Sequence, residues 1–260
     1  MAVALAGALV LSGFFVPDLE AQLRPGDPTM DERTVEVSWI TSDERTVHAT
    51  WFGSLGPPHG IVMALHQAGA SGRGEYGPII PRLTEGGWDV VAVDLREGGS
   101  RFGGENRTAG DDGGNGDYCA AEADLLGGIP YIRGVRADIP LVLFGSSYSA
   151  ALALRAAAVH YNDVSGVVAF SPATEGPMAA CRGEEVTEGL LTSILAVRPA
   201  DEMERDSAQE QFRRLREQGH RTYVADPGVH GASTLVEERV GGDVEATWRV
   251  VEEFLRDVRR

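Results

Sequence analysis

Apolar residues along the chain fall into short runs that predict β-strands. The first two runs, 34–40 and 45–52, alternate between apolar and polar positions as an antiparallel hairpin does, with Ser42 and Asp43 in the turn between them. The later runs are continuous and rich in valine and isoleucine, which is typical of strands buried on both faces. They are residues 61–65, 89–93, 141–144, 167–170, 194–197 and 222–225.

Segments with helical spacing lie between and after the later strands. They are residues 76–85, 118–126, 149–160, 203–218 and 245–258. A hairpin followed by alternating strands and helices predicts an α/β fold, with a mostly parallel, twisted sheet of these eight strands and helices on both faces. In such a sheet the reactive groups gather at the carboxyl ends of the strands.

Two turn-rich stretches, 97–116 and 171–189, each follow a predicted strand. Both should therefore lie over the edge of the sheet where a site is expected. Neither is long enough to form a large cap domain. We therefore predict one α/β domain over residues 34–260 with an open pocket.

The N-terminus begins with an apolar run, 2–16, which is shorter than the roughly 20 residues that a membrane-spanning helix needs. We interpret residues 1–21 as a signal peptide, with Ala21 as the small residue before cleavage, and residues 22–33 as a linker. No basic residue precedes the run, so an uncleaved anchor or a misassigned start are the alternatives. A signal peptide predicts a secreted or periplasmic protein without a stable membrane span, and its absence predicts a cytoplasmic one.

Export would place Cys119 and Cys181 in an oxidising compartment, where they could form a disulfide. The alternative is that both are buried small apolar residues.

Composition narrows the possible functions. The chain has 39 acidic and 23 basic side chains, and its formal net charge of -16 disfavours nucleic acid as a partner. It contains no lysine. That absence excludes a Schiff-base lysine, a lysine-bound pyridoxal phosphate and the phosphate-binding lysine of the common nucleotide loop.

The strongest local motif runs from strand to helix through Gly145-Ser146-Ser147-Tyr148-Ser149. Small residues on either side of a serine let the backbone turn sharply and raise the hydroxyl above the sheet. The pattern predicts Ser147 as a nucleophile. The alternative is an ordinary strand-to-helix turn, in which glycine and serine are also common.

Two later segments offer a base and an acid for that nucleophile. His230 lies in a loop directly after the last predicted strand, where its imidazole could take the serine proton. Asp201 and Glu202 follow the preceding strand, and either carboxylate could orient the imidazole. Their alternative role is to stabilise the dipole of the helix that follows.

Taken together, these segments resemble the α/β-hydrolase superfamily, in particular its compact dienelactone-hydrolase-like and esterase branches. The resemblance covers residues 34–260, and Ser149 replaces the last glycine of the family's G-x-S-x-G motif. Dienelactone hydrolases use cysteine as the nucleophile, so their substrate is not expected here. The chain order of nucleophile, acid and base is also that of the superfamily, and matching of the acid turn favours Glu202 over Asp201.

The resemblance implies hydrolysis of a small-molecule acyl substrate through an acyl-enzyme, with no metal and no organic cofactor. Its oxyanion hole would use the N–H of Tyr148 and that of Gln67 or Ala68, with His66 fixing the loop. Residues proposed to line the substrate pocket are Tyr76, Arg101, Phe102 and Met178.

Carboxylic-ester hydrolysis is the leading hypothesis for the function. A peptidase, amidase or acyltransferase could use the same three side chains, because all of them pass through an acyl-enzyme. A binding protein that keeps the fold without turnover is the non-enzymatic alternative.

Overall fold

The computed structural model describes residues 33–110 and 114–259. The predicted signal peptide and the linker up to residue 32 lie outside the described residues, as do 111–113 of the first turn-rich stretch.

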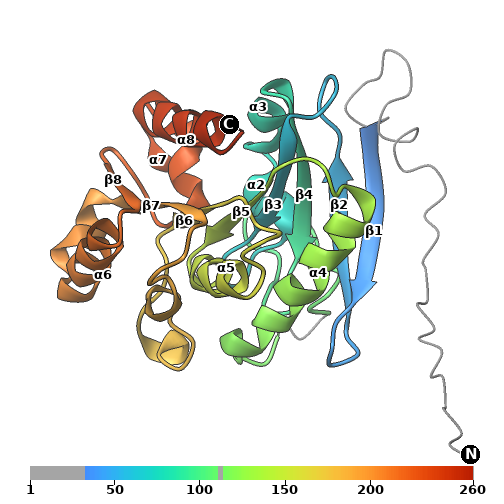
Figure 1. Ribbon diagram of the computed structural model, residues 1–260, viewed down its shortest axis with the longest axis horizontal. Helices are drawn as coiled ribbons and strands as arrows, with labels where there is room; N and C mark the ends of the chain where they lie inside the picture. The colour runs from blue at the N-terminus through green and yellow to red at the C-terminus, as the bar shows by residue number, and fades with distance from the viewer. Residues whose placement is uncertain (1–32, 111–113, 260) are drawn as a thin grey trace, which may run out of the picture.

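All eight predicted strands are present and form one sheet (Figure 1). The strand order is β1-β2-β4-β3-β5-β6-β7-β8. β2 is antiparallel to β1 and β4, and all other neighbours are parallel. The strands are β1 (Thr34–Ile40), β2 (Thr46–Phe52), β3 (Gly60–Leu65), β4 (Trp88–Asp94), β5 (Leu141–Ser146), β6 (Gly166–Phe170), β7 (Ser193–Pro199) and β8 (Arg221–Ala225).

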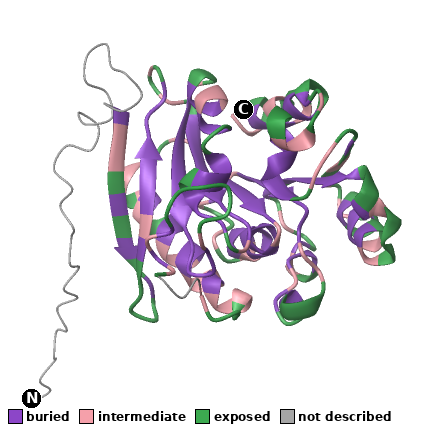
Figure 2. Ribbon diagram, turned by 180° about the vertical axis from the view of Figure 1, so that it is seen from behind, coloured by how far each residue is buried: buried purple, intermediate pink, exposed green. Residues whose placement is uncertain are grey.

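Helices cover both faces of the sheet, as the sequence predicts. They are α2 (Gly72–Tyr76), α3 (Ile80–Glu85), α4 (Glu122–Val135), α5 (Tyr148–Val159), α6 (Asp206–Glu217), α7 (Glu237–Val240) and α8 (Glu245–Val258). The central strands are buried on both sides, which Figure 2 shows as continuous purple. In β3, Ile61 packs into the cluster under α4 and α5, whereas Val62 packs into the cluster under α3 and α8. This alternation explains why the strand has no polar face.

Two helix predictions are corrected by the structure. The predicted helix at 76–85 begins later than expected: α2 ends at Tyr76 and α3 begins at Ile80, with Gly77 and Pro78 in the turn between them. Glycine disfavours helix, and proline lacks the N–H that a continuous helix would use. The helix predicted at 118–126 is instead a 3-10 turn followed by α4, which continues to Val135 in spite of Pro130. Packing of the apolar face of α4 onto the sheet outweighs these local preferences.

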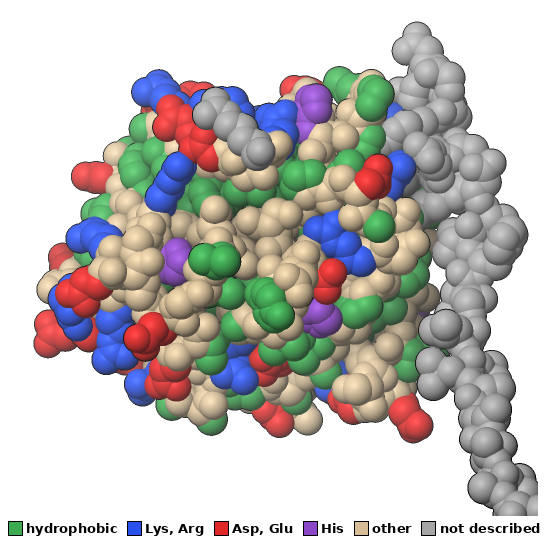
Figure 3. Space-filling model, viewed as in Figure 1, with side chains coloured by type: hydrophobic (Ala, Val, Ile, Leu, Met, Phe, Trp, Pro, Cys, Tyr) green, Lys and Arg blue, Asp and Glu red, His purple; other side chains and the backbone are tan. Residues whose placement is uncertain are grey.

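The two turn-rich stretches contain only short 3-10 turns in their described parts, so no large cap covers the sheet. The disulfide considered from the sequence is present: Cys119 and Cys181 are bonded, and they join the 3-10 turn before α4 to the loop after β6. In the part of the chain that the structure describes, no helix has the length and apolar character needed to cross a membrane. Figure 3 shows that acidic and basic side chains are spread around the rim of the viewed face.

Candidate active site

Ser147 occupies a sharp turn between β5 and α5. Its backbone has φ 62° and ψ −117°, a conformation that a serine adopts only where the surrounding structure imposes it. A Cβ at Gly145 would overlap the Cα of Ala150, so the turn requires glycine there. The side chain of Ser147 is partly exposed. These features are those of a nucleophile elbow.

The serine that replaces the motif's last glycine has its own structural role. The Ser149 hydroxyl donates to the Leu65 carbonyl at 2.8 Å and accepts the N–H of Ser146 at 2.9 Å. It therefore ties the turn to the end of the neighbouring strand β3. The departure from the motif adds a contact and leaves the turn intact.

His230 and Glu202 are brought together at the carboxyl ends of β8 and β7. The distance between His230 Nδ1 and Glu202 Oε1 is 2.5 Å. A carboxylate can only accept, so Nδ1 carries the proton and Nε2 is left as the basic nitrogen. The side chain of Glu202 is 6% exposed and that of His230 is 50% exposed. A buried acid thus orients an accessible imidazole.

A buried arginine holds the second oxygen of Glu202. Arg198 Nη1 lies 2.6 Å from Glu202 Oε2, and its Nη2 donates to Gln211 Oε1 at 2.7 Å. Burial by itself would raise the pKa of Glu202, but the hydrogen bond from His230 and the charges of His230 and Arg198 outweigh it. The pKa of Glu202 is therefore below its ordinary value, and the acid is ionised at neutral pH. Asp201, the alternative acid, is exposed, and no hydrogen bond joins its side chain to His230.

The loops that carry Ser147 and His230 are joined directly. The N–H of Ala232 donates to Ser146 Oγ at 2.9 Å, and the N–H of Gly231 donates to Ser171 Oγ at 3.0 Å. Ser146, directly before the elbow serine, is thus hydrogen-bonded to Ala232, two residues after His230.

One of the two oxyanion-hole N–H groups predicted in the loop after β3 is already hydrogen-bonded within the protein. The N–H of Gln67 donates to Glu75 Oε2 at 2.6 Å, so it is already used, which removes it from the predicted oxyanion hole. Among residues 33–110 and 114–259, no acceptor receives the N–H of Ala68 or that of Tyr148. These two groups are the remaining oxyanion-hole candidates.

His66 has the loop-fixing position predicted for it. Its Nε2 accepts the N–H of Leu95 at 2.8 Å, and its Nδ1 therefore donates to the carbonyl of Gln67, also at 2.8 Å. Burial lowers the pKa of His66 to about 4, so its ring is neutral at physiological pH. Both ring nitrogens are used within the protein, which leaves none for a second base.

Of the four proposed pocket residues, the structure buries two and exposes two. Tyr76 is wrong as a lining residue: it is 0% exposed, and its hydroxyl donates to the carbonyls of Leu65 and Phe144 inside the sheet. Met178 is also buried, against Cys181. Arg101 and Phe102 are exposed, and Arg101 forms a parallel bridge with Ala70, at the end of the loop that contains Gln67.

Three polar residues around the site were missed from the sequence: Glu75, Ser171 and Arg198. Arg198 ends an apolar strand and is 5% exposed, and Glu75 is 0% exposed within a glycine-rich stretch. A charged residue within an apolar or glycine-rich segment was the available signal. Its meaning depends on partners from distant parts of the chain.

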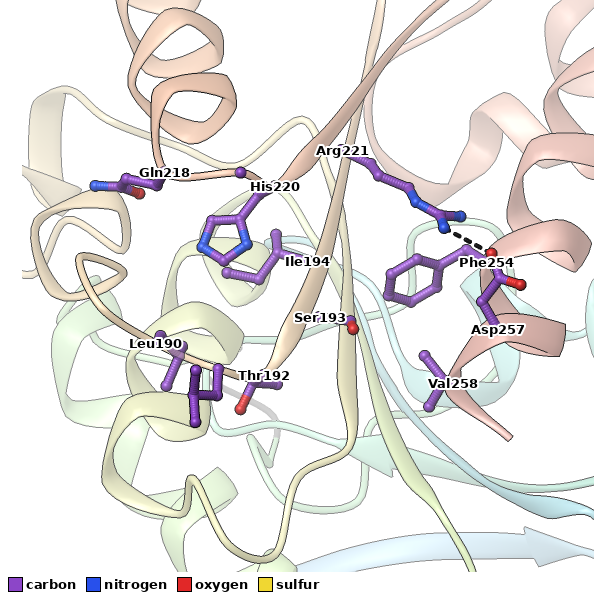
Figure 4. A pocket seen from close by; sticks show the side chains of 12 residues that line it. Leu190, Thr192, Ser193, Ile194, Gln218, His220, Arg221, Phe254, Asp257 and Val258 are labelled. Carbon is purple, nitrogen blue, oxygen red and sulfur yellow. Dashed lines mark hydrogen bonds and ion pairs between the residues drawn. The ribbon is translucent and has the colours of Figure 1, made fainter. Parts of the chain in front are cut away.

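A separate hollow of about 340 Å³ lies at the opposite end of the last two strands (Figure 4). It is lined by Ser193 and Arg221, which begin β7 and β8, and by Phe254, Asp257 and Val258 of α8. It contains none of the residues described above. The hollow is therefore distinct from the candidate active site.

Comparison with known proteins agrees with the fold. The family model described as "Serine aminopeptidase, S33" matches residues 56–235. No curated protein sequence matches the chain significantly.

Several solved structures are similar to the chain. An esterase of Pyrococcus furiosus is 19% identical with a TM-score of 0.63, covering 89% of this chain and 96% of that one. A dienelactone hydrolase of Anabaena variabilis is 18% identical with a TM-score of 0.57, covering 86% and 98%. An acylaminoacyl peptidase of Pyrococcus horikoshii is 11% identical with a TM-score of 0.59, covering 86% and 41%.

At these identities the solved structures show a shared fold. The family model covers most of the chain, including the elbow, both candidate acids and the histidine loop. The chain therefore belongs to the serine aminopeptidase S33 family within the α/β-hydrolase superfamily.

Proposed function

We propose that this protein is a serine hydrolase that cleaves a carboxylic ester of a small molecule through an acyl-enzyme. The observation that carries the proposal is the bond between the buried Glu202 carboxylate and His230, on a loop bonded to the elbow of Ser147. An ionised acid that fixes the imidazole tautomer is what a serine needs to become a nucleophile at neutral pH.

In the proposed reaction, Ser147 Oγ attacks the ester carbonyl carbon while His230 Nε2 takes the hydroxyl proton. The carbonyl oxygen becomes an oxyanion, and the N–H groups of Ala68 and Tyr148 donate to it. The C–O bond to the alcohol then breaks, and the alcohol leaves with the proton from the imidazolium. Water repeats the sequence on the acyl-enzyme, releasing the acid and restoring the serine.

Glu202 stays ionised throughout because Arg198 and the imidazolium both stabilise its charge. Burial lowers the pKa of Arg198, but a guanidinium starts so far above neutrality that it remains charged. The site therefore keeps a negative charge beside Nδ1 of His230, where it stabilises the positive charge of the imidazolium.

The choice of an ester is supported by the similar structures that are described as an esterase and a dienelactone hydrolase. Peptide or amide hydrolysis is the second candidate, favoured by the name of the matching family and by the similar acylaminoacyl peptidase. Both reactions use the same acyl-enzyme and differ in the leaving group.

A labelling and turnover experiment tests the proposal. We expect wild-type protein to react with a fluorophosphonate probe at Ser147 and to hydrolyse p-nitrophenyl acetate faster than aminoacyl p-nitroanilides. Ser147→Ala should lose labelling and lower kcat by about 10⁴-fold or more, whereas Ser193→Ala, at the other end of the sheet, should retain both. A wild-type protein that neither labels nor turns over would favour the binding-protein alternative.

We also propose that the protein acts in an oxidising compartment outside the cytoplasm, after removal of residues 1–21. The disulfide between Cys119 and Cys181 supports this, because such bonds are rare in the cytosol. N-terminal sequencing of protein recovered from an exporting host should begin at residue 22. An uncleaved N-terminus in that fraction would contradict the proposed processing.

A further inference from the structure

Glu75 is a buried carboxylate that the proposed reaction does not use. It lies in the short helix α2 and is 0% exposed. Its Oε1 accepts the Ser146 hydroxyl at 2.6 Å and the side-chain amide of Gln67 at 3.0 Å, and its Oε2 accepts the Gln67 N–H at 2.6 Å. A carboxylate removed from water needs several hydrogen-bond donors to stabilise its charge. All three partners of Glu75 are donors, so this position suits a side chain whose two oxygens both accept.

Three loops of the candidate active site meet at this carboxylate. Gln67 belongs to the oxyanion loop, and Ser146 is the residue before the elbow serine. The Ser146 oxygen also accepts the N–H of Ala232 at 2.9 Å, from the loop that carries the histidine. Gly231 in that loop has φ 73°, and a Cβ there would overlap Ser146 Oγ. The histidine loop is therefore packed so closely on Ser146 and Glu75 that position 231 has no space for a side chain.

Three hydrogen-bond donors and the guanidinium of Arg239 surround the Glu75 side chain. Burial raises the pKa of Glu75 above its ordinary value, and the hydrogen bonds from Ser146 and Gln67 and the charge of Arg239 offset only part of that rise. The guanidinium of Arg239 donates to the carbonyls of Gly74 and Glu75, so it is held beside the carboxylate by the backbone of α2. An ionised carboxylate accepts from all three donors at once, which a neutral amide cannot do.

We propose that Glu75 is a positioning residue that sets the oxyanion loop and the histidine loop relative to Ser147, an assignment that rests on the hydrolase function proposed above. By accepting the N–H of Gln67, it turns that group away from the pocket and leaves the N–H of Ala68 to face the substrate oxygen. By accepting the hydroxyl proton of Ser146, it directs a lone pair of that oxygen to Ala232. Glu75 acts through these groups and does not touch the substrate.

This role makes a specific kinetic prediction for Glu75→Gln. The amide keeps the size of the side chain but presents an NH₂ group to donors that need an acceptor. The oxyanion donor should shift, and a displaced donor weakens binding of the transition state more than binding of the ester. We expect kcat for p-nitrophenyl acetate to fall by about tenfold to a hundredfold, with KM changed by less than about threefold.

A boronic acid separates this effect from simple destabilisation. Phenylboronic acid forms a tetrahedral adduct with a serine oxygen, so its affinity depends on the oxyanion donors. All rates are divided by the concentration of active sites titrated with the fluorophosphonate probe, which removes any unfolded fraction. The inhibition constant of the boronate should rise in Glu75→Gln by the same factor by which kcat/KM falls.

Two further variants complete the test. Ser146→Ala keeps the contacts between Glu75 and Gln67 but breaks the link to the histidine loop, so kcat should fall by only about fivefold. Asp89→Asn is the matched control, because Asp89 is also a fully buried carboxylate but accepts the Trp51 indole and the Ser54 N–H near the start of β4. It should lower stability without changing the titrated kcat or the affinity of the boronate.

Unchanged titrated kcat and boronate affinity in Glu75→Gln would overturn the role of Glu75 while leaving the hydrolase function in place. If that variant does not fold, an unchanged kcat in Ser146→Ala overturns the role instead. A fall of equal size in Asp89→Asn would also overturn it, because the effect would then be that of any lost buried carboxylate. Failure of the hydrolase function itself is recognised separately, as a wild-type protein without labelling or turnover.

Discussion

Two arginine–carboxylate pairs lie at opposite ends of the last two strands and have the same separation. Arg198 and Glu202, at the carboxyl end of β7, are 2.6 Å apart with both side chains 6% exposed. Arg221 and Asp257, at the amino end of β8, are also 2.6 Å apart but are 52% and 41% exposed. Distance alone does not distinguish these pairs, whereas burial does.

The difference shows where this molecule can perform chemistry. At the carboxyl end, buried charges are fixed by hydrogen bonds to several partners, so their orientation and ionisation are set before a substrate arrives. At the amino end, a hollow of about 340 Å³ adjoins a solvated ion pair that water screens. The burial of partnered charge therefore distinguishes the candidate site, whereas the presence of a hollow does not.

The largest effect should separate the two neighbouring acids. Glu202→Gln should lower kcat by about 10⁴-fold, because the amide no longer fixes the imidazole tautomer or stabilises its cation. Asp201→Asn should stay within about twofold of wild type, since its side chain is exposed and lies outside the network. Steady-state kinetics on probe-titrated enzyme measures both. Equal losses in the two variants would remove the assignment of Glu202.

The next effect tests the two ion pairs directly. Arg198→Met leaves the Glu202 charge buried without its guanidinium and should lower the free energy of unfolding by about 3–5 kcal/mol. Arg221→Met should lower it by only about 0–1 kcal/mol. Urea denaturation of the two variants, followed by circular dichroism, measures the difference. Similar losses in both would mean that burial does not distinguish the two ends.

The smallest effect concerns pH. The pKa of His66 is lowered to about 4 by burial, so between about pH 6.5 and pH 4 the unfolded chain binds a proton that the folded protein does not. The free energy of unfolding therefore includes the full contribution of the neutral His66 ring above about pH 6.5. That contribution falls by about 3 kcal/mol in total as the pH is lowered to about 4.

His220, at the amino end of β8, provides the comparison for that pH dependence. Burial also lowers its pKa, but the residue is only half-buried, so its contribution should be smaller. Plots of unfolding free energy against pH should flatten more in His66→Asn than in His220→Asn. The opposite order would contradict the assignment of His66 as a neutral ring that fixes the loop.

The sequence predicted the strands well because their signal is local. Continuous apolar runs bounded by turn residues predict buried strands wherever they occur, and all eight strands were found with small differences at their ends. The sequence predicted helix boundaries less reliably where glycine or proline occurs: Gly77 lies in a turn that interrupts a predicted helix, whereas α4 continues through Pro130. There, packing against the sheet decides the outcome, and packing is not visible in a local pattern.

The sequence by itself determined the fold class, the sharp turn at Ser147 and the order along the chain of the candidate nucleophile, acid and base. The tertiary structure decided that Glu202 and not Asp201 bonds His230, that the N–H of Gln67 is already used, and that Tyr76 is part of the core. It also revealed Arg198 and Glu75, whose partners are far apart along the chain. The physical reason is that a motif depends on neighbouring residues, whereas burial and hydrogen bonding of a charge depend on which distant segments the fold brings together.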